Sequence, residues 1–265
     1  MATRLVDYAV SEGVATIVLS DPPMNAYTHE MMRDLDEAIL DARFDNEVHV
    51  VVLTGRGDNF FCAGANIRML SEVDETYKYY FYLHANETLS RLEQTPKLVI
   101  AAINGHCVGG GLEVALACDL RLARRGLARV GLPEVELGVL PGTGGTQRLA
   151  RLLGKAKAIR LMVEGAPFDV DQAHAHGLVS DVIEAESTEE FHAKVHAFAR
   201  RFTPPDKASL AVGRIKRAVQ SGSEMALEQG LALERELQSQ LFASADAKEG
   251  LLAFVGKRKP KFEAR

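Results

Sequence analysis

The stretch from Lys97 to Gly145 decides the fold, and it reads KLVIAAINGHCVGGGLEVALACDLRLARRGLARVGLPEVELGVLPGTGG. Its apolar run, residues 98–103, is followed by an Asn-Gly pair and then by three successive glycines at 109–111. This order predicts a buried strand that runs into a tight turn opening a helix over residues 109–118. Glu113 is the only charged residue in that helical stretch, and a second acid, Glu134, follows Pro133 and precedes a glycine-rich segment.

The helix opening and the acid within it suit one kind of chemistry. The first turn of a helix leaves backbone N–H groups without intrahelical partners and carries the positive end of the helix dipole. Glycines at that point let a ligand oxygen approach the N–H donors closely. Burial of Glu113 among apolar neighbours raises the pKa of its carboxyl and suits it to proton transfer near neutrality. The stretch therefore predicts an oxyanion site with a proton carrier beside it.

Both acids have structural alternatives when the residues are considered alone. Glu113 would also satisfy a buried ion pair with Arg121 or Arg148. Glu134 has a rival in Glu136, which faces the other way if the segment is extended.

The composition describes an ordinary globular protein of 265 residues, with 47% hydrophobic and 25% charged residues. A net charge of -5 and a pI near 5.9 argue against a surface dedicated to nucleic acids or anionic membranes. We expect a cytoplasmic protein, because no apolar run reaches the length of a membrane span and residues 1–7 lack a signal-peptide core. Three cysteines match no zinc pattern, so we expect reduced thiols at Cys62, Cys107 and Cys118.

Apolar strand-like runs alternate with helical patterns along the first part of the chain. A hairpin is predicted within residues 4–19, and Thr28 is placed to cap a helix that runs to about Phe44. A second long helix is predicted over roughly residues 72–94. Gly64, between small residues, indicates either a backbone that comes close to another group or a tight turn under the core. Because helices separate the runs, we predict an α/β fold with parallel strands at about 14–19, 48–53, 98–103, 120–123 and 179–183.

The composition changes near Phe191, after which four helical patterns follow with no strand between them. The chain is accordingly divided into a core over residues 1–190 and a helical region over residues 191–265. Leucines along residues 227–241 offer more apolar surface than an exposed helix tolerates, so we expect burial against the core or a neighbouring subunit.

Several familiar motifs are missing or fail on geometry. The sequence has no phosphate-binding P-loop, no G-x-G-x-x-G, no G-x-S-x-G and no H-E-x-x-H. His174 and His176 point to different faces of a helix and are rejected as metal ligands. His106 and Cys107 are rejected as a nucleophilic pair, since neighbours on a strand point apart. No metal site is predicted.

With these residues in hand, the chain resembles the crotonase (enoyl-CoA hydratase/isomerase) superfamily over nearly its whole length. The motifs that carry the resemblance are FFCAGANI, AAINGHCVGGGLEVALACDLRLA, GLPEVELGVLPGTGGTQRLARLLG, GLVSDVI and EGLLAFVGKRKPKF. The resemblance implies a crotonase-like spiral of ββα turns with a C-terminal helical trimerisation region. Homotrimers that pair into hexamers are the assembly it implies.

The resemblance also implies roles for particular residues. The thioester oxygen of an acyl-CoA would rest on the backbone N–H groups of Ala65 and Gly110. Glu113 and Glu134 match the two glutamates with which hydratases bind and activate water, and the N–H of Gly142 would help to orient that water. Hydration of a 2-enoyl-CoA to a 3-hydroxyacyl-CoA is the reaction implied, with no cofactor beyond the coenzyme A of the substrate.

Contacts to coenzyme A follow from the same resemblance. The backbone of Ala63 would meet the adenine, and Arg68 and Lys257 would contact the phosphates, Lys257 from a neighbouring subunit. Asn66 departs from the Asp that many members carry after the oxyanion alanine. This difference leaves the acyl preference open.

Two other functions within this fold are weighed against hydration. An enoyl-CoA isomerase would move a proton with one glutamate, and some relatives of this fold bind RNA, which the acidic balance disfavours. The sequence does not identify the acyl chain. An aromatic helix, with residues 77 and 79–82 all Tyr or Phe, would either shape the acyl pocket or pack under the tail helices.

Overall fold

The apolar runs of the sequence form one six-stranded sheet in the computed structural model, which describes residues 4–265. The strand order is β1-β2-β3-β5-β7-β9, and all pairings are parallel except that of the β1–β2 hairpin. The five predicted parallel strands are therefore confirmed. The strands are β1 (Val6–Ser11), β2 (Val14–Leu19), β3 (Val50–Gly55), β5 (Leu98–Ile103), β7 (Leu120–Arg124) and β9 (Asp181–Ile183).

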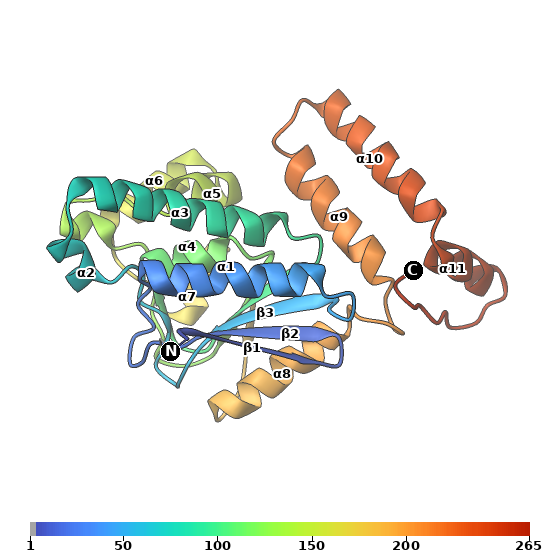
Figure 1. The fold of residues 1–265 in the computed structure, drawn as a ribbon, viewed down its shortest axis with the longest axis horizontal. Helices are drawn as coiled ribbons and strands as arrows, with labels where there is room; N and C mark the ends of the chain where they lie inside the picture. Colours follow the sequence, from blue (N-terminus) through green and yellow to red (C-terminus); the bar gives the residue numbers. More distant parts are fainter. Residues whose placement is uncertain (1–3) are drawn as a thin grey trace.

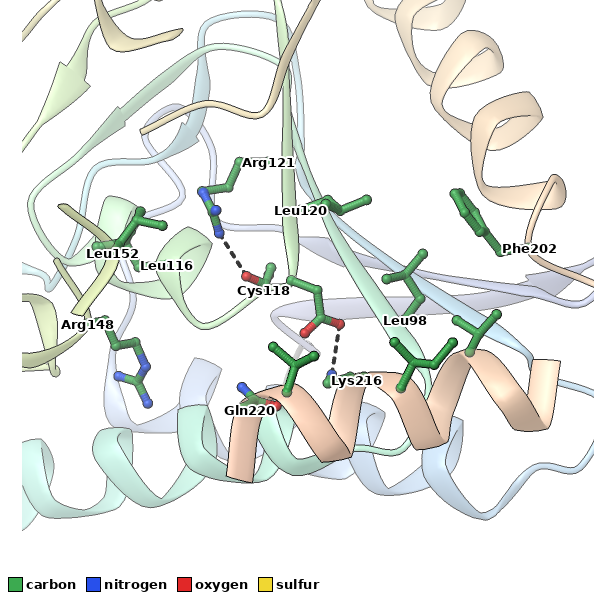
Figure 2. Close-up of a pocket in the computed structure, with 14 residues that line it drawn as sticks. Leu98, Leu116, Cys118, Leu120, Arg121, Arg148, Leu152, Phe202, Lys216 and Gln220 are labelled. Carbon is green, nitrogen blue, oxygen red and sulfur yellow. Dashed lines mark hydrogen bonds and ion pairs between the residues drawn. The ribbon is translucent and has the colours of Figure 1, made fainter. Parts of the chain in front are cut away.

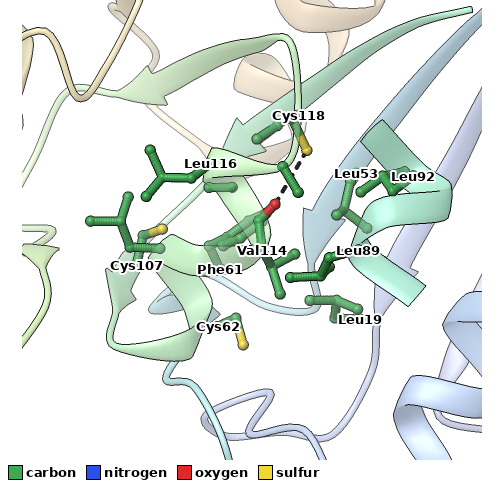
Figure 3. Packing of buried hydrophobic residues seen from close by; sticks show 14 of the residues in the cluster. Leu19, Leu53, Phe61, Cys62, Leu89, Leu92, Cys107, Val114, Leu116 and Cys118 are labelled. Atoms are coloured by element: carbon green, nitrogen blue, oxygen red, sulfur yellow. Dashed lines mark hydrogen bonds between the residues drawn. The ribbon is translucent and has the colours of Figure 1, made fainter. Parts of the chain in front are cut away.

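The sheet is buried on both faces. Along β3, Val51 and Leu53 belong to the larger hydrophobic cluster, whereas Val50 and Val52 belong to a smaller one on the opposite face. Such alternation is what a strand covered on both sides requires. Helix α1 (His29–Phe44) contributes to the larger cluster and α8 (Thr188–Arg200) to the smaller one. The interior of the larger cluster, seen in Figure 3, holds Cys62, Cys107 and Cys118 as free thiols.

A second, three-stranded sheet was not predicted. It consists of β4 (Phe60–Cys62), β6 (His106–Val108) and β8 (Val130–Gly131), paired in parallel in the order β4-β6-β8. Each of these short strands follows a strand of the large sheet, so the chain repeats a β-β-helix turn and confirms the predicted spiral. The prediction that the strand over 98–103 runs directly into a helix was wrong, because β6 lies between them.

The helices of the core agree with the sequence except in one region. The Thr28 side chain caps α1 by accepting a hydrogen bond from the Met31 amide, as predicted. The long helix predicted over roughly 72–94 is confirmed as α3 (Glu75–Gln94), with Asp74 as its N-cap, whereas the short helix α2 (Ile67–Glu72) before it was not predicted. The remaining core helices are α4 (Gly110–Leu116), α5 (Gly145–Leu153), α6 (Lys155–Glu164) and α7 (Val170–His176).

The last helices separate into one that covers the sheet and three that extend from the core. In Figure 1, α8 lies against the sheet, while α9 (Ser209–Gly222), α10 (Leu227–Phe242) and α11 (Ala245–Val255) project to one side. The predicted boundary between residues 190 and 191 falls within α8, and the two-part division stays a prediction.

Helix α9 is fastened to the core by a buried ion pair (Figure 2). Lys216 Nζ lies 2.9 Å from Asp119 Oδ2, and the two side chains are only 6% and 16% exposed. Asp119 Oδ2 also accepts a hydrogen bond from the Val99 amide in β5, at 2.7 Å. The ion pair therefore connects α9 to the sheet where the neighbouring strands β5 and β7 begin.

Candidate active site

Segments from five parts of the chain surround one cavity of about 470 Å³, and Tyr27 and α3 are among them. It lies where β4, the start of α4, a short 3-10 helix η1 (Glu134–Leu137) and the loop before α5 approach one another. The residues that line it include Ala63, Ala65, Gly110, Glu113, Glu134 and Gly142, together with apolar side chains of α2 and of residues 137–140.

The backbone around Ala65 is held so that its N–H is free to meet a ligand. Tyr27 N donates to Gly64 O and Asn66 N donates to Tyr27 O, each at 2.9 Å. Neighbouring peptide groups in an extended segment point in alternate directions, so the Ala65 N–H faces away from Tyr27. Within residues 4–265 this N–H has no hydrogen-bond acceptor.

The Gly110 amide lies beside this segment, at the first position of α4. A Cβ atom added to Gly64, whose φ is +92°, would stand 2.8 Å from Gly110 N. The close approach of these two segments is thus the reason for glycine at position 64, which decides against a simple turn. Two unpaired backbone N–H groups at adjacent points of a cavity are the donors that an oxyanion requires.

Glu113 projects from α4 into the cavity and is 2% exposed. Its Oε1 accepts hydrogen bonds from the amides of Thr143, at 2.8 Å, and Gly145, at 2.6 Å. Burial raises the pKa of the Glu113 carboxyl, and the two amide hydrogen bonds oppose that rise. One oxygen is therefore fixed by the loop before α5, and within the described chain no amide donates to Oε2.

The ion pairs considered for Glu113 are absent from the described structure. Arg121 donates instead to the carbonyl oxygens of Leu178, Ala115 and Cys118. Arg148 forms an ion pair with Glu93 at 3.0 Å and donates to the Thr143 carbonyl. Arg148 thus supports the loop that holds Glu113 rather than neutralising the acid directly.

Glu134 enters the same cavity from η1, whereas Glu136 is exposed and does not line it. The expectation of an extended segment was wrong, because residues 134–137 form a turn of 3-10 helix. Burial raises the pKa of Glu134 to about 7, and the negative charge of Glu113 adds to the rise. Glu134 Oε2 is buried without a hydrogen-bond partner in residues 4–265. A buried, unpaired carboxyl oxygen beside a second acid indicates a place for a polar ligand.

The loop around Gly142 is also part of the cavity wall. The Asn86 side chain donates to the Gly142 carbonyl at 3.2 Å, and the ring of Tyr82 lies against Gly142. Of the aromatic residues on α3, Tyr82 lines the cavity, Phe81 is buried, and Tyr79 and Tyr80 are mostly exposed.

Of the three residues expected to contact coenzyme A, only one lines the cavity. Ala63 lines the cavity. Arg68 does not; its side chain is 88% exposed and pairs with Glu72 at 3.2 Å. Lys257 follows α11, far along the chain from the cavity wall, with a φ of +51°. Asn66 caps α2 by accepting from the Met69 amide at 3.0 Å, a role that Asp would fill equally well.

Three contributors to the site were missed by sequence reasoning. Tyr27 and Thr143 share a buried hydrogen bond, and Lys78 lines the cavity from α3. Of these three, only Thr143 could have been found from the sequence, because it lies between Gly142 and Gly144 in the glycine-rich segment.

The arrangement unites two backbone donors with two acids of raised pKa. Comparison with known proteins agrees with this chemistry. The sequence profile described as enoyl-CoA hydratase/isomerase matches residues 9–265. The chain belongs to the enoyl-CoA hydratase/isomerase family. It is therefore an enzyme of a family that acts on coenzyme A thioesters.

Relatives within this family match almost end to end. A probable enoyl-CoA hydratase of Bacillus subtilis is 36% identical over 97% of this chain and 98% of its own length. The short-chain-enoyl-CoA hydratase of Clostridium acetobutylicum is 36% identical over 93% of this chain and 92% of its own. The 2,3-dehydroadipyl-CoA hydratase of Escherichia coli is 38% identical over 91% of each chain.

Solved structures in the enoyl-CoA hydratase/isomerase family share the fold of this member. The enoyl-CoA hydratase of Geobacillus kaustophilus superposes with a TM-score of 0.94 at 40% identity, covering 100% of this chain and 98% of the other. That of Bacillus anthracis gives 0.90 at 31% identity, covering 98% and 100%. The predicted crotonase fold is thereby confirmed.

Residues 4–265 of this family member contain neither a metal-binding cluster nor a membrane-spanning helix. They contain no group of three or more His, Cys, Asp or Glu side chains placed to hold a metal ion. None of their helices has both the length and the apolar character that crossing a bilayer demands.

Proposed function

We propose that this family member is an enoyl-CoA hydratase, which adds water across the 2,3 double bond of a 2-enoyl-CoA to give a 3-hydroxyacyl-CoA. The observation that carries the proposal is the pair of acids on one cavity wall: Glu113 with one oxygen fixed, and Glu134 with a buried oxygen that has no partner. Relatives named as hydratases of enoyl-CoA, crotonyl-CoA and 2,3-dehydroadipyl-CoA support the same reaction.

The amides of Ala65 and Gly110 would bind the thioester oxygen. Negative charge grows on that oxygen as the enolate forms, and donors that already point at it need no reorganisation. One such donor contributes on the order of 3 kcal/mol to transition-state stabilisation.

The two acids would divide the proton transfers between them. Glu113 Oε2 takes a proton from the water as its oxygen bonds to C3, and the electrons of the double bond move into the enolate. Glu134, which burial keeps protonated up to about pH 7, then delivers its proton to C2. The net change is the addition of one water, and exchange with solvent returns each acid to its starting state. A positioned acid or base contributes ~10² to 10⁴ in rate.

The remaining assignments concern binding and orientation. The Gly142 N–H would orient the attacking water, because the loop that carries it is anchored by Asn86 and Arg148. Ala63 would meet the adenine. Arg68 and Lys257 would contact the phosphates; Arg68 would first have to leave Glu72, an exposed ion pair of little stability.

A homotrimer, or a hexamer of two trimers, would bring Lys257 of one subunit to the cavity of the next. Support comes from the projecting helices, whose apolar residues Leu227, Phe254 and Val255 are 76%, 85% and 81% exposed in a single chain. Apolar surface of this extent is typical of an assembly interface. Sedimentation velocity at micromolar concentration tests this, and a monomer would contradict it.

We further propose that the reaction takes place in the cytoplasm and needs no cofactor. The acids and amides described supply the proton transfers and the charge stabilisation, and coenzyme A enters as part of the substrate.

Hydration of crotonyl-CoA, with the product identified by mass, tests the reaction. Glu113→Gln and Glu134→Gln should each lower kcat by at least ~10²-fold. The exposed Glu136→Gln, two residues from Glu134, is the matched control and should keep wild-type turnover. An isomerase would instead shift the double bond of a 3-enoyl-CoA and give no 3-hydroxy product, which would overturn the proposal.

A further inference from the structure

The cavity continues beyond the reacting groups along a mostly apolar wall. This wall includes Ile67, Leu70, Leu137, Val139 and Leu140. An apolar wall suits the carbon chain of an acyl group. It lies on α2, at the end of η1 and on the segment that follows η1.

Among residues 4–265, Lys78 is the only cationic side chain that lines this cavity. It lies on α3, four residues before Tyr82, so both side chains are on the same face of the helix. Tyr82 adjoins the reaction centre, since its ring lies against Gly142. Four residues of α-helix span about 6 Å, so Lys78 lies about one helical turn along α3 from Tyr82, away from the residue that contacts Gly142.

Lys78 has no anionic partner within residues 4–265. Asp74 and Glu75 stand four and three residues before it, at spacings that permit ion pairs on a helix. Neither forms one with Lys78, and no hydrogen bond of the Lys78 ammonium is found within that range. Arg68, the other cation of this region, is already paired with Glu72. Lys78 is partly buried, so its charge is only partly solvated.

The two acids of the reaction centre make the cavity unfavourable for a further negative charge unless a cation offsets them. We propose that this cavity takes enoyl-CoA substrates whose acyl chain ends in a carboxylate, and that Lys78 pairs with that carboxylate. The inference rests on the proposed function in one respect: the proposed mechanism decides which end of the cavity holds the acyl chain. Charge recognition at that point would set the substrate preference within a family that shares its catalytic groups.

The test compares two six-carbon substrates that differ in the terminal group, 2-hexenedioyl-CoA and 2-hexenoyl-CoA. Wild type should show the higher kcat/KM with 2-hexenedioyl-CoA. Lys78→Met should lower that kcat/KM by about tenfold or more and change the value for 2-hexenoyl-CoA far less. Lys78→Arg should retain part of the preference. Lys155→Met, which removes an exposed lysine on α6, controls for the loss of a positive charge.

Binding of the saturated thioesters adipyl-CoA and hexanoyl-CoA, measured by calorimetry, makes the test independent of turnover. The preference for adipyl-CoA should be present in wild type, be lost in Lys78→Met and weaken as salt is raised. If neither crotonyl-CoA nor 2-hexenedioyl-CoA is hydrated but the binding preference holds, the hydratase assignment fails and the recognition of the carboxylate by Lys78 stands.

Two results would overturn the inference. If Lys78→Met lowers kcat/KM equally for both substrates, Lys78 contacts the coenzyme A moiety that the two substrates share. No preference for the carboxylate in wild type would show that Lys78 does not recognise the acyl terminus.

Discussion

The hydroxyl oxygens of Tyr27 and Thr143 lie 2.8 Å apart in the interior, although 116 residues separate them in the chain. The backbone of Tyr27 holds the segment that carries the Ala65 amide, and its ring lies under Gly110, where an added Cβ would come within 2.1 Å of Tyr27 Oη. Thr143 in turn donates its amide to Glu113. Tyr27 thus connects both proposed oxyanion donors to the loop that fixes the proposed base.

Removal of the Tyr27 hydroxyl should loosen the Thr143 loop without disturbing the ring that packs under Gly110. We expect Tyr27→Phe to lower kcat roughly fivefold, the equivalent of one hydrogen bond of about 1 kcal/mol, with little change in KM. Steady-state kinetics on crotonyl-CoA measures both constants. Tyr8→Phe is the control, since the Tyr8 hydroxyl is buried without a partner in the described chain. An unchanged kcat in Tyr27→Phe would rule out this positioning role.

Gly64→Ala should block the proposed oxyanion site. The added methyl group would stand 2.8 Å from Gly110 N, where the thioester oxygen has to bind. We expect kcat to fall ~10²- to 10³-fold, as for the loss of one oxyanion donor. Gly57→Ala is a close control, because Gly57 has a similar φ of +83° but no atom within 4 Å of the added methyl. Equal losses in the two variants would attribute the effect to backbone strain alone.

The pH dependence of kcat/KM should be bell-shaped. Burial, with the charge of Glu113, raises the pKa of Glu134 to about 7, so its proton-donating form is lost as pH rises through that value. Burial also raises the pKa of Glu113, so the ionised base is lost on the acidic side at a pH above the ordinary range of glutamate. The two limbs of the pH profile give apparent pKa values that belong to the pair of acids together and not to either residue alone. Measurement from pH 5 to 9 with crotonyl-CoA checks this, and activity that keeps rising above pH 8 would exclude Glu134 as the acid.

Glu134 should also make stability depend on pH. Its folded-state pKa of about 7 exceeds the unfolded value of 4.5, so the folded protein binds more protons between these values. Stability therefore falls as pH rises across this window and levels off above it. Glu134→Gln should raise Tm relative to wild type at pH 8 and much less at pH 5. Scanning calorimetry with Glu136→Gln as charge control measures the difference, and an equal gain at both pH values would contradict the assignment.

The buried pair of Lys216 and Asp119 should matter most when only one partner is removed. Lys216→Met leaves the Asp119 carboxylate without its cation in a largely desolvated position. We expect this to lower the free energy of unfolding by about 3 kcal/mol or more. The double variant with Asp119→Asn should recover part of that loss. Urea unfolding of wild type, of Lys216→Met, of Asp119→Asn and of the double variant, with Lys155→Met as surface control, gives the coupling energy. A double variant less stable than the sum of the two single losses would contradict a stabilising pair.

The sequence could not reveal the short strands of the second sheet or the choice between the two acids of η1. Strands of two or three residues are too short for a period-2 pattern, so β4, β6 and β8 left no local signal. Glu134 and Glu136 differ by two positions, and only the 3-10 geometry of the segment directs one inward and the other to solvent. The six residues of α2 are too few to show a helical period, so this helix left no local signal either.

What the sequence determined by itself was local: the long apolar runs that became strands, the amphipathic helices, and an isolated acid in the apolar stretch around Glu113. These follow from the spacing of apolar and polar residues, which acts over a few neighbours. The tertiary structure alone decided that Tyr27 meets Thr143, that Gly64 approaches Gly110, and that Lys78 lines the same cavity as Glu134. Such contacts arise when the spiral closes and brings distant segments together, and no local pattern of residues records that closure.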